Sequence, residues 1–119
     1  MDLLINIDVP NLDQGVAFYE QAFGLTVTRR LGPEAVELSG LPVRLYLLQK
    51  PGGSIGAGAD PRRYDRHWTP VHVDVVVDDI EAALRRAVAR GAGRDGCPRQ
   101  RLGQDRGHVR PLRPRLLPH

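Results

Sequence analysis

A strand-like segment followed by capping residues and an amphipathic helix occurs twice in this chain of 119 residues. The apolar residues at helical spacing are Leu12, Val16, Tyr19 and Phe23 in the first copy and Ile80, Leu84, Ala87 and Gly91 in the second. Each residue of the second set lies 68 positions after its counterpart. A supersecondary unit that recurs in register indicates two copies of one structural module. The alternative is that two amphipathic helices follow two strands by coincidence.

The first copy has the clearest pattern of elements. Residues 3–9 alternate as a half-buried strand does, and Pro10 ends that strand. Asn11 with Gln14 resembles a capping box, which predicts a helix from Leu12 to Phe23 with Gly24 as its C-cap. Three further strands are predicted, at residues 25–31, 35–38 and 43–49. Residues 1–50 are therefore a β-α-β-β-β module.

The rest of the chain divides into three segments. Residues 51–70 are rich in Gly, Pro and charge and are predicted to be a linker with little regular structure. Residues 71–92 repeat the strand, the acidic cap and the helix, and so begin a second module. Residues 93–119 interleave Pro, Arg and Gly without strand-like alternation, which is typical of a disordered basic extension. The second module is expected to lack three strands.

Four short segments resemble a known family. They are residues 9–12 (Val-Pro-Asn-Leu), 17–19 (Ala-Phe-Tyr), 23–25 (Phe-Gly-Leu) and 77–80 (Val-Asp-Asp-Ile). They are similar to the module starts of the vicinal oxygen chelate superfamily, which contains glyoxalases, bleomycin-resistance proteins and extradiol dioxygenases. The resemblance covers about residues 3–92. It implies an α+β fold in which paired β-α-β-β-β modules form a curled mixed sheet around a ligand-binding cleft.

The basic C-terminal segment departs from that family. If residues 102–118 are back-translated and read one nucleotide later, the genetic code permits a sequence that contains Ser-Asp-Pro-Phe-Gly and ends in Phe-Cys-Leu. This sequence resembles the closing turn and final strand of the family. We therefore hypothesise a frameshift near residues 91–94, so that residues 93–119 as written are an aberrant basic tail.

The resemblance also implies where a metal would bind. The family's ligands are a His near the start of the first strand of each module and a carboxylate or Gln in the last strand. Leu4 and His72 occupy the two His positions, and Tyr46 stands where a Glu is expected. Neutral Tyr is a poor ligand for divalent ions, and Leu cannot bind them. Since His72 is the one remaining ligand position and catalytic sites use about three protein ligands, we expect no metal and no other cofactor.

These positions favour ligand binding over metal-assisted chemistry. We predict a metal-independent small-molecule binding protein of the glyoxalase/bleomycin-resistance type, with its ligand in the cleft between the modules. The residues expected to line that site are Asn6, Tyr46, His67, Trp68 and His72. One alternative is a metal-dependent lyase or dioxygenase with atypical ligands. Another is a degenerate frameshift product without function.

Charge and composition limit the partners. The formal net charge is +3, but residues 1–92 carry a net charge of −2 and the last 27 residues a net charge of +5. Because no recognition motif accompanies the arginines, nucleic-acid binding is not expected. With no long apolar run and no signal-peptide pattern, we expect a cytoplasmic protein without a membrane partner. The incomplete second module suggests a homodimer.

Overall fold

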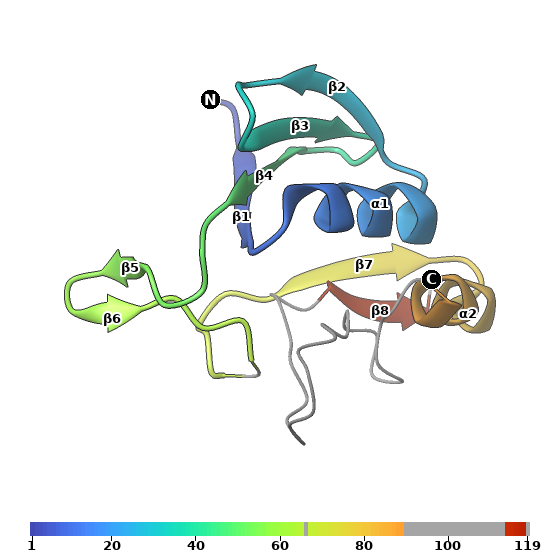
Figure 1. Ribbon diagram of the computed structural model, residues 1–119. Helices are drawn as coiled ribbons and strands as arrows, with labels where there is room; N and C mark the ends of the chain where they lie inside the picture. The colour runs from blue at the N-terminus through green and yellow to red at the C-terminus, as the bar shows by residue number, and fades with distance from the viewer. Residues whose placement is uncertain (66, 90–113, 119) are drawn as a thin grey trace. The chain divides into compact units, whose positions relative to one another are not determined.

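The computed structural model describes residues 1–65, 67–89 and 114–118, and the chain separates into two compact units, Met1–Arg63 and Tyr64–His119. The first unit contains β1 (Leu4–Val9), α1 (Leu12–Phe23), β2 (Thr26–Arg30), β3 (Ala35–Ser39), β4 (Arg44–Gln49), β5 (Ile55–Ala57) and β6 (Asp60–Pro61) (Figure 1). The second contains β7 (Val73–Val77), α2 (Ile80–Ala89) and β8 (Pro114–Pro118). The fold is α+β, as the sequence predicted, and the β-α-β-β-β order of residues 1–50 is confirmed.

Four strands of the first unit form a curled mixed sheet in the order β1-β4-β3-β2 (Figure 1). The β2–β3 and β3–β4 pairs are antiparallel, whereas β1 pairs with β4 in parallel, with Ile5 opposite Leu45 and Ile7 opposite Leu47. A parallel pair needs a crossover connection, and α1 together with β2 and β3 provides it.

The core lies between this sheet and α1. Alternate residues of β1, β3 and β4 point toward the helix and are buried, namely Ile7, Val9, Val36, Leu38, Leu45 and Leu47. The helix contributes Leu12, Val16, Tyr19 and Ala22. Gly15 allows close approach, because a Cβ there would lie 3.2 Å from Val9 Cγ1 and 3.4 Å from Leu47 Cδ1.

Both ends of α1 are fixed as the sequence suggested. Asn11 Oδ1 accepts a hydrogen bond of 2.9 Å from the backbone N–H of Gln14. The backbone N–H of Leu12 donates to Gln49 Oε1 at 2.9 Å, so the end of β4 satisfies a second free donor of the helix. At the other end Gly24 adopts the left-handed conformation with φ 69°, as a helix C-cap commonly does.

The predicted linker contains structure that the sequence analysis missed. Strands β5 and β6 form a short antiparallel hairpin within residues 51–70. Backbone hydrogen bonds from Gly53 to Arg62 and from Arg62 to Ser54 extend the pairing beyond the strands. The glycine-rich composition predicted a flexible linker, but Gly53 and Gly58 supply the positive φ values that tight turns require.

The second unit also corrects an expectation. Residues 93–119 were predicted to contain no strand, but β8 pairs in parallel with β7, with Val73 opposite Pro114 and Val77 opposite Pro118. The two prolines lie at the ends of β8, where a missing N–H costs least. This parallel pairing repeats that of β1 with β4 in the first unit. Residues 90–113, on which the frameshift hypothesis mainly rests, lie outside the described residues.

Helix α2 begins as the repeat predicted, with Asp79 Oδ1 accepting a hydrogen bond from the backbone N–H of Ala82 at 2.9 Å. Its buried residues are Ala83 and Ala87, whereas Leu84 is half-buried and Ile80 is exposed. Neither helix in the described part of the chain has the length and apolar character needed to cross a membrane.

The contribution of the core can be measured with one matched pair of leucines. Leu47 is fully buried beneath α1, whereas Leu31 is exposed at the end of β2. We expect Leu47→Ala to lower the unfolding free energy by about 2–5 kcal/mol, because it leaves a cavity in a packed core. Leu31→Ala should change it by no more than about 0.5 kcal/mol. Urea unfolding followed by circular dichroism measures both, and equal losses would contradict this placement of the core.

Candidate functional site

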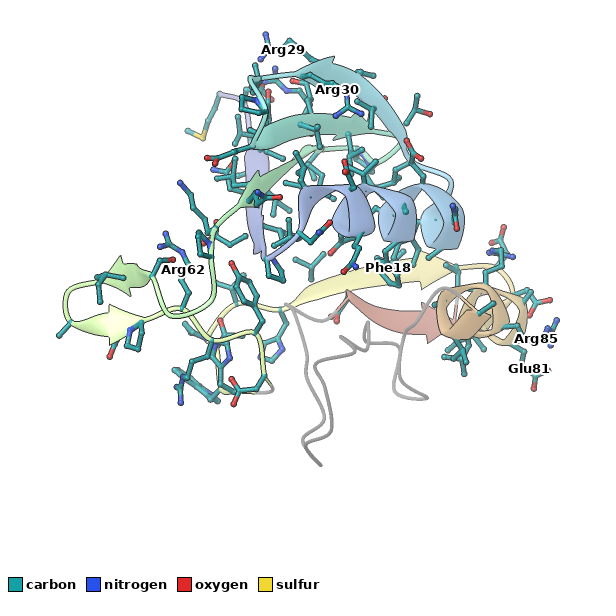
Figure 2. All side chains as sticks on the ribbon, viewed as in Figure 1. Phe18, Arg29, Arg30, Arg62, Glu81 and Arg85 are labelled. Atoms are coloured by element: carbon teal, nitrogen blue, oxygen red, sulfur yellow. The ribbon has the colours of Figure 1, made fainter. Side chains whose placement is uncertain are left out.

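The face of the first sheet that turns away from α1 carries polar side chains. Because strand residues alternate, the burial of Ile7, Val9, Leu45 and Leu47 beneath the helix directs their neighbours to the opposite side. We call this side the polar face; besides Leu4 and Leu48 it carries Asn6, Asp8, Thr28, Arg29, Glu37 and Tyr46. In Figure 2 the labelled Arg29 lies on the side of the sheet remote from α1.

Tyr46 stands at the centre of the polar face. It lies on β4 directly between Asn6 of β1 and Glu37 of β3, which are its partners in the sheet register. Although it does not face the helix, its side chain is only 7% exposed. Its hydroxyl donates a hydrogen bond to the carboxylate of Glu37. The partly buried tyrosine thus has its polar atom satisfied within the sheet.

A β-bulge brings two consecutive residues of β2 to the same carboxylate. The register steps from Val27 opposite Leu38 to Arg29 opposite Glu37, so that two residues of β2 match one of β3. Thr28 Oγ1 donates to Glu37 Oε1 at 3.0 Å, and Arg29 Nη2 lies 3.7 Å from Glu37 Oε2. Arg29 Nη2 also donates to the Tyr46 hydroxyl at 3.4 Å. Without the bulge, strand alternation would direct Arg29 to the other side of the sheet.

These contacts keep Glu37 ionised. The hydrogen bond from Tyr46, and after it the hydrogen bond from Thr28, lowers the pKa of Glu37 below its ordinary value of 4.5. Partial burial opposes this by raising the pKa, and the charges of Arg29 and Arg44 lower it further. The side chain of Glu37 is 15% exposed, so its negative charge is largely covered by its hydrogen-bond donors.

The hairpin of β5 and β6 is joined to the polar face by one arginine. Arg62 Nε donates to Asp8 Oδ2 at 2.9 Å, and Arg62 Nη1 donates to Ser54 Oγ at 3.2 Å and to the Ile55 carbonyl at 2.6 Å. This set of charge-assisted hydrogen bonds fixes the hairpin beside the end of β1. Arg62 is labelled in Figure 2.

The structure brings two of the five predicted site residues together. Asn6 and Tyr46 are neighbours on the polar face. His67, Trp68 and His72 belong to the second unit, in the segment that precedes β7. His67 Nδ1 lies 2.9 Å from the Asp65 carbonyl, and Trp68 is 82% exposed.

The sequence analysis missed Glu37 and Arg29. Glu37 lies between the buried residues Val36 and Leu38, and this alternation is a signal for the outer face of a strand. Arg29 had no such signal, because the bulge that redirects it is a property of strand pairing. Glu37 and Arg29 are nevertheless the charged groups that contact Tyr46.

The residues at the family's metal-ligand positions do not fit a metal ion. Leu4 on β1 has an aliphatic side chain, 41% exposed, with no donor atom. The Tyr46 hydroxyl is engaged with Glu37, and Arg29 places a positive charge beside both. Within residues 1–65, 67–89 and 114–118, no group of three or more His, Cys, Asp or Glu side chains could hold a metal ion.

With this geometry established, comparison with known proteins identifies the family. Residues 4–106 match the family described as the glyoxalase-like domain. The chain belongs to this family. Its membership confirms the resemblance to the vicinal oxygen chelate superfamily that the short segments suggested. No curated protein matches the chain.

Several solved structures share the fold of this chain. An Arabidopsis thaliana gene product is 21% identical, with a TM-score of 0.52, over 78% of this chain and 73% of its own. A hypothetical protein from S. aureus is 14% identical, with a TM-score of 0.53, over 76% of this chain and 70% of its own. A glyoxalase/bleomycin resistance protein/dioxygenase from Alicyclobacillus acidocaldarius is 21% identical, with a TM-score of 0.51, over 77% and 64%. The chain thus spans less than two thirds of the Alicyclobacillus protein.

The hydrogen bond from Tyr46 to Glu37 gives a pH-dependent contribution to stability in this glyoxalase-like chain. Because the pKa of Glu37 is lowered in the folded state, the contribution is fully present above the unfolded-state pKa of about 4.3. It is lost as the pH falls through the lower folded-state pKa. Tyr46→Phe removes the donor and raises the pKa of Glu37. Urea unfolding should therefore show a smaller fall in unfolding free energy between about pH 7 and pH 3 than in the unmodified chain.

Two further variants serve as controls for this measurement. Glu37→Gln should remove the same part of the pH dependence, because it removes the titrating group. Glu34→Gln, the matched change at an exposed carboxyl, should leave the pH dependence of the unfolding free energy unchanged. If the unfolding free energy fell between about pH 7 and pH 3 as much in Tyr46→Phe and Glu37→Gln as in the unmodified chain, the Tyr46–Glu37 hydrogen bond would not stabilise the fold.

Proposed function

We propose that this chain is a metal-independent small-molecule binding protein of the glyoxalase/bleomycin-resistance type, whose ligand rests on the polar face of the first sheet. The family and its fold support this choice of class. Asn6 and Tyr46 lie in the site, together with Glu37 and Arg29. His67, Trp68 and His72 remain predicted ligand contacts from the second unit.

The single observation that supports metal independence is the engagement of Tyr46. A tyrosine hydroxyl that donates to Glu37 and accepts from Arg29 has its hydrogen-bonding groups used within the protein. Coordination of a divalent ion by Tyr46 or Glu37 would require both contacts to break and would place the ion beside a guanidinium. The two positive charges, on the ion and on Arg29, would repel each other.

The names of the structural relatives are consistent with a binder and with an enzyme. The Alicyclobacillus relative carries glyoxalase, bleomycin resistance protein and dioxygenase in one name. Of these three, resistance by binding a compound needs neither a metal nor a reacting group. The polar face offers hydrogen-bond donors and the carboxylates of Asp8 and Glu37, and polar groups of this kind suit recognition of a ligand.

The proposal predicts the outcome of a metal titration. Purified protein should carry no stoichiometric divalent metal, and added Zn, Ni, Mn or Fe should not raise its melting temperature in a saturable way. A tight site would be easy to detect, since a hundredfold excess of metal over Kd stabilises a fold by about 2.7 kcal/mol. Elemental analysis and thermal melts measure both quantities.

Two sets of variants separate a real metal site from surface binding. About one metal per chain, lost in His72→Ala together with the thermal shift, would replace the binder with the metal-dependent lyase or dioxygenase. Metal lost only in the His108→Ala/His119→Ala double variant would instead be bound by those two histidines and would leave the proposal standing. Failure of the full chain to unfold cooperatively would favour a degenerate product.

We further propose that the binder acts as a homodimer in the cytoplasm. The support for a dimer is the sequence argument that the second module as written is incomplete, and the second unit exposes Val71, Val76 and Val88. Light scattering at micromolar concentration should give about twice the chain mass of 13.2 kDa. A stable, cooperatively unfolding monomer at that concentration would contradict the dimer.

A further inference from the structure

We propose that the ligand of the polar face carries an oxyanion, a carboxylate or a phosphate, and that the guanidinium of Arg29 binds it. The inference rests on the proposed function and narrows its ligand class. Four observations support it: the free donors of Arg29, the bulge that presents it, the covering of the nearby carboxylates, and the apolar residues on the same face.

Arg29 retains most of its hydrogen-bonding capacity. A guanidinium has five N–H donors in a rigid plane that matches two oxygens of a carboxylate or phosphate. In the part of the chain that the structure describes, only Nη2 makes contacts, at 3.4 Å to Tyr46 Oη and 3.7 Å to Glu37 Oε2. Both are long for charge-assisted hydrogen bonds. The side chain is also 58% exposed, so Nε and Nη1 are open to a ligand.

The β-bulge holds this arginine in place for binding. It directs Thr28 and Arg29 to the same side of β2, where Glu37 and Tyr46 restrain the end of the guanidinium. A side chain that is already restrained loses less conformational entropy when a ligand binds. Bulges are common beside functional sites because they redirect a side chain in this way.

The acidic groups of the polar face have partners within the protein, although the side chain of Asp8 is 38% exposed, whereas Arg29 keeps open donors. Glu37 accepts hydrogen bonds from Tyr46 and Thr28 and is 15% exposed, and Asp8 is paired with Arg62. Arg44, on the same strand as Tyr46, pairs with the highly exposed Asp2. An approaching ligand therefore meets the positive group of the Arg29–Glu37 pair first.

The same face also carries two leucines, on β1 and β4, whereas Arg29 lies on β2 at the other edge of the sheet. By strand alternation, Leu4 of β1 and Leu48 of β4 lie on the side of Tyr46, and Leu4 is 41% exposed. These two leucines can contact an apolar body that extends across the sheet from the anionic group. The favoured ligand is thus a small organic acid with an apolar portion.

The test uses three simple probes of the same size class: sodium benzoate, phenyl phosphate and neutral benzyl alcohol. Each is titrated into the full chain while the backbone amide signals of β2 and β3 are followed by NMR. At least one of the two anions should bind saturably, and benzyl alcohol should bind about tenfold or more weakly. The tighter anion identifies the carboxylate or the phosphate as the source of the charge.

A matched pair of variants locates the binding group. Arg29→Ala should lower the affinity for the more tightly bound anion about tenfold or more, because charge-assisted hydrogen bonds are lost. Arg30→Ala, the neighbouring exposed arginine whose register partner is the buried Val36, should leave the affinity unchanged. If Arg29→Ala fails to fold, Arg29→Lys, which keeps the charge, replaces it in the test. Arg29→Lys should also weaken binding of the anion, because lysine lacks the planar pair of donors.

Three results would overturn the inference. They are equal binding of benzyl alcohol and the anions, equal effects of the changes at Arg29 and Arg30, and the absence of saturable binding by either anion. None of these affects metal independence, which the metal titration tests separately. A saturable metal site that depends on His72 would overturn the proposed function whatever the anions do.

Discussion

The parallel pairing of β1 with β4 determines how the first unit is organised. Because these strands run in the same direction, α1 and the β2–β3 pair must form the connection between them, and the helix comes to cover one face of the sheet. The register of these strands then determines which side chains meet on the face away from the helix. With Ile7 opposite Leu47 on the helix side, Asn6 and Tyr46 are paired on the other side, and Glu37 joins them from β3.

Much of this arrangement could be predicted from the sequence, because it follows from periodicity and capping. The alternation in residues 3–9, the Asn11 cap and the Gly24 C-cap lie in local sequence, and each predicted its element within one or two residues. The repeat at an offset of 68 positions predicted β7 and the start of α2 in the same way. The family resemblance then predicted that Tyr46 stands at a metal-ligand position, and this stays a prediction.

What the sequence did not predict depends on contacts between distant residues. The bulge at Thr28 arises from the pairing of β2 with β3, and no property of residues 26–30 alone reveals it. The hydrogen bond between Arg62 and Asp8 joins residues 54 positions apart, so local sequence gives no sign of it. The glycine-rich segment that contains Arg62 was therefore predicted to be an unstructured linker. Strand β8 was missed because prolines at its ends resemble a break in structure, although they suit a strand terminus.

The central claim is that Tyr46, at a position where the resemblance predicts a metal ligand, is committed to a hydrogen bond with Glu37 and not to a metal ion. Crystals of the full chain soaked in zinc, with anomalous diffraction recorded at the zinc absorption edge, test this most directly. The account predicts an intact contact between the Tyr46 hydroxyl and the Glu37 carboxylate and no anomalous peak within about 2.0–2.2 Å of either side chain. A zinc ion bound by Tyr46 or Glu37, with their mutual hydrogen bond broken, would contradict it.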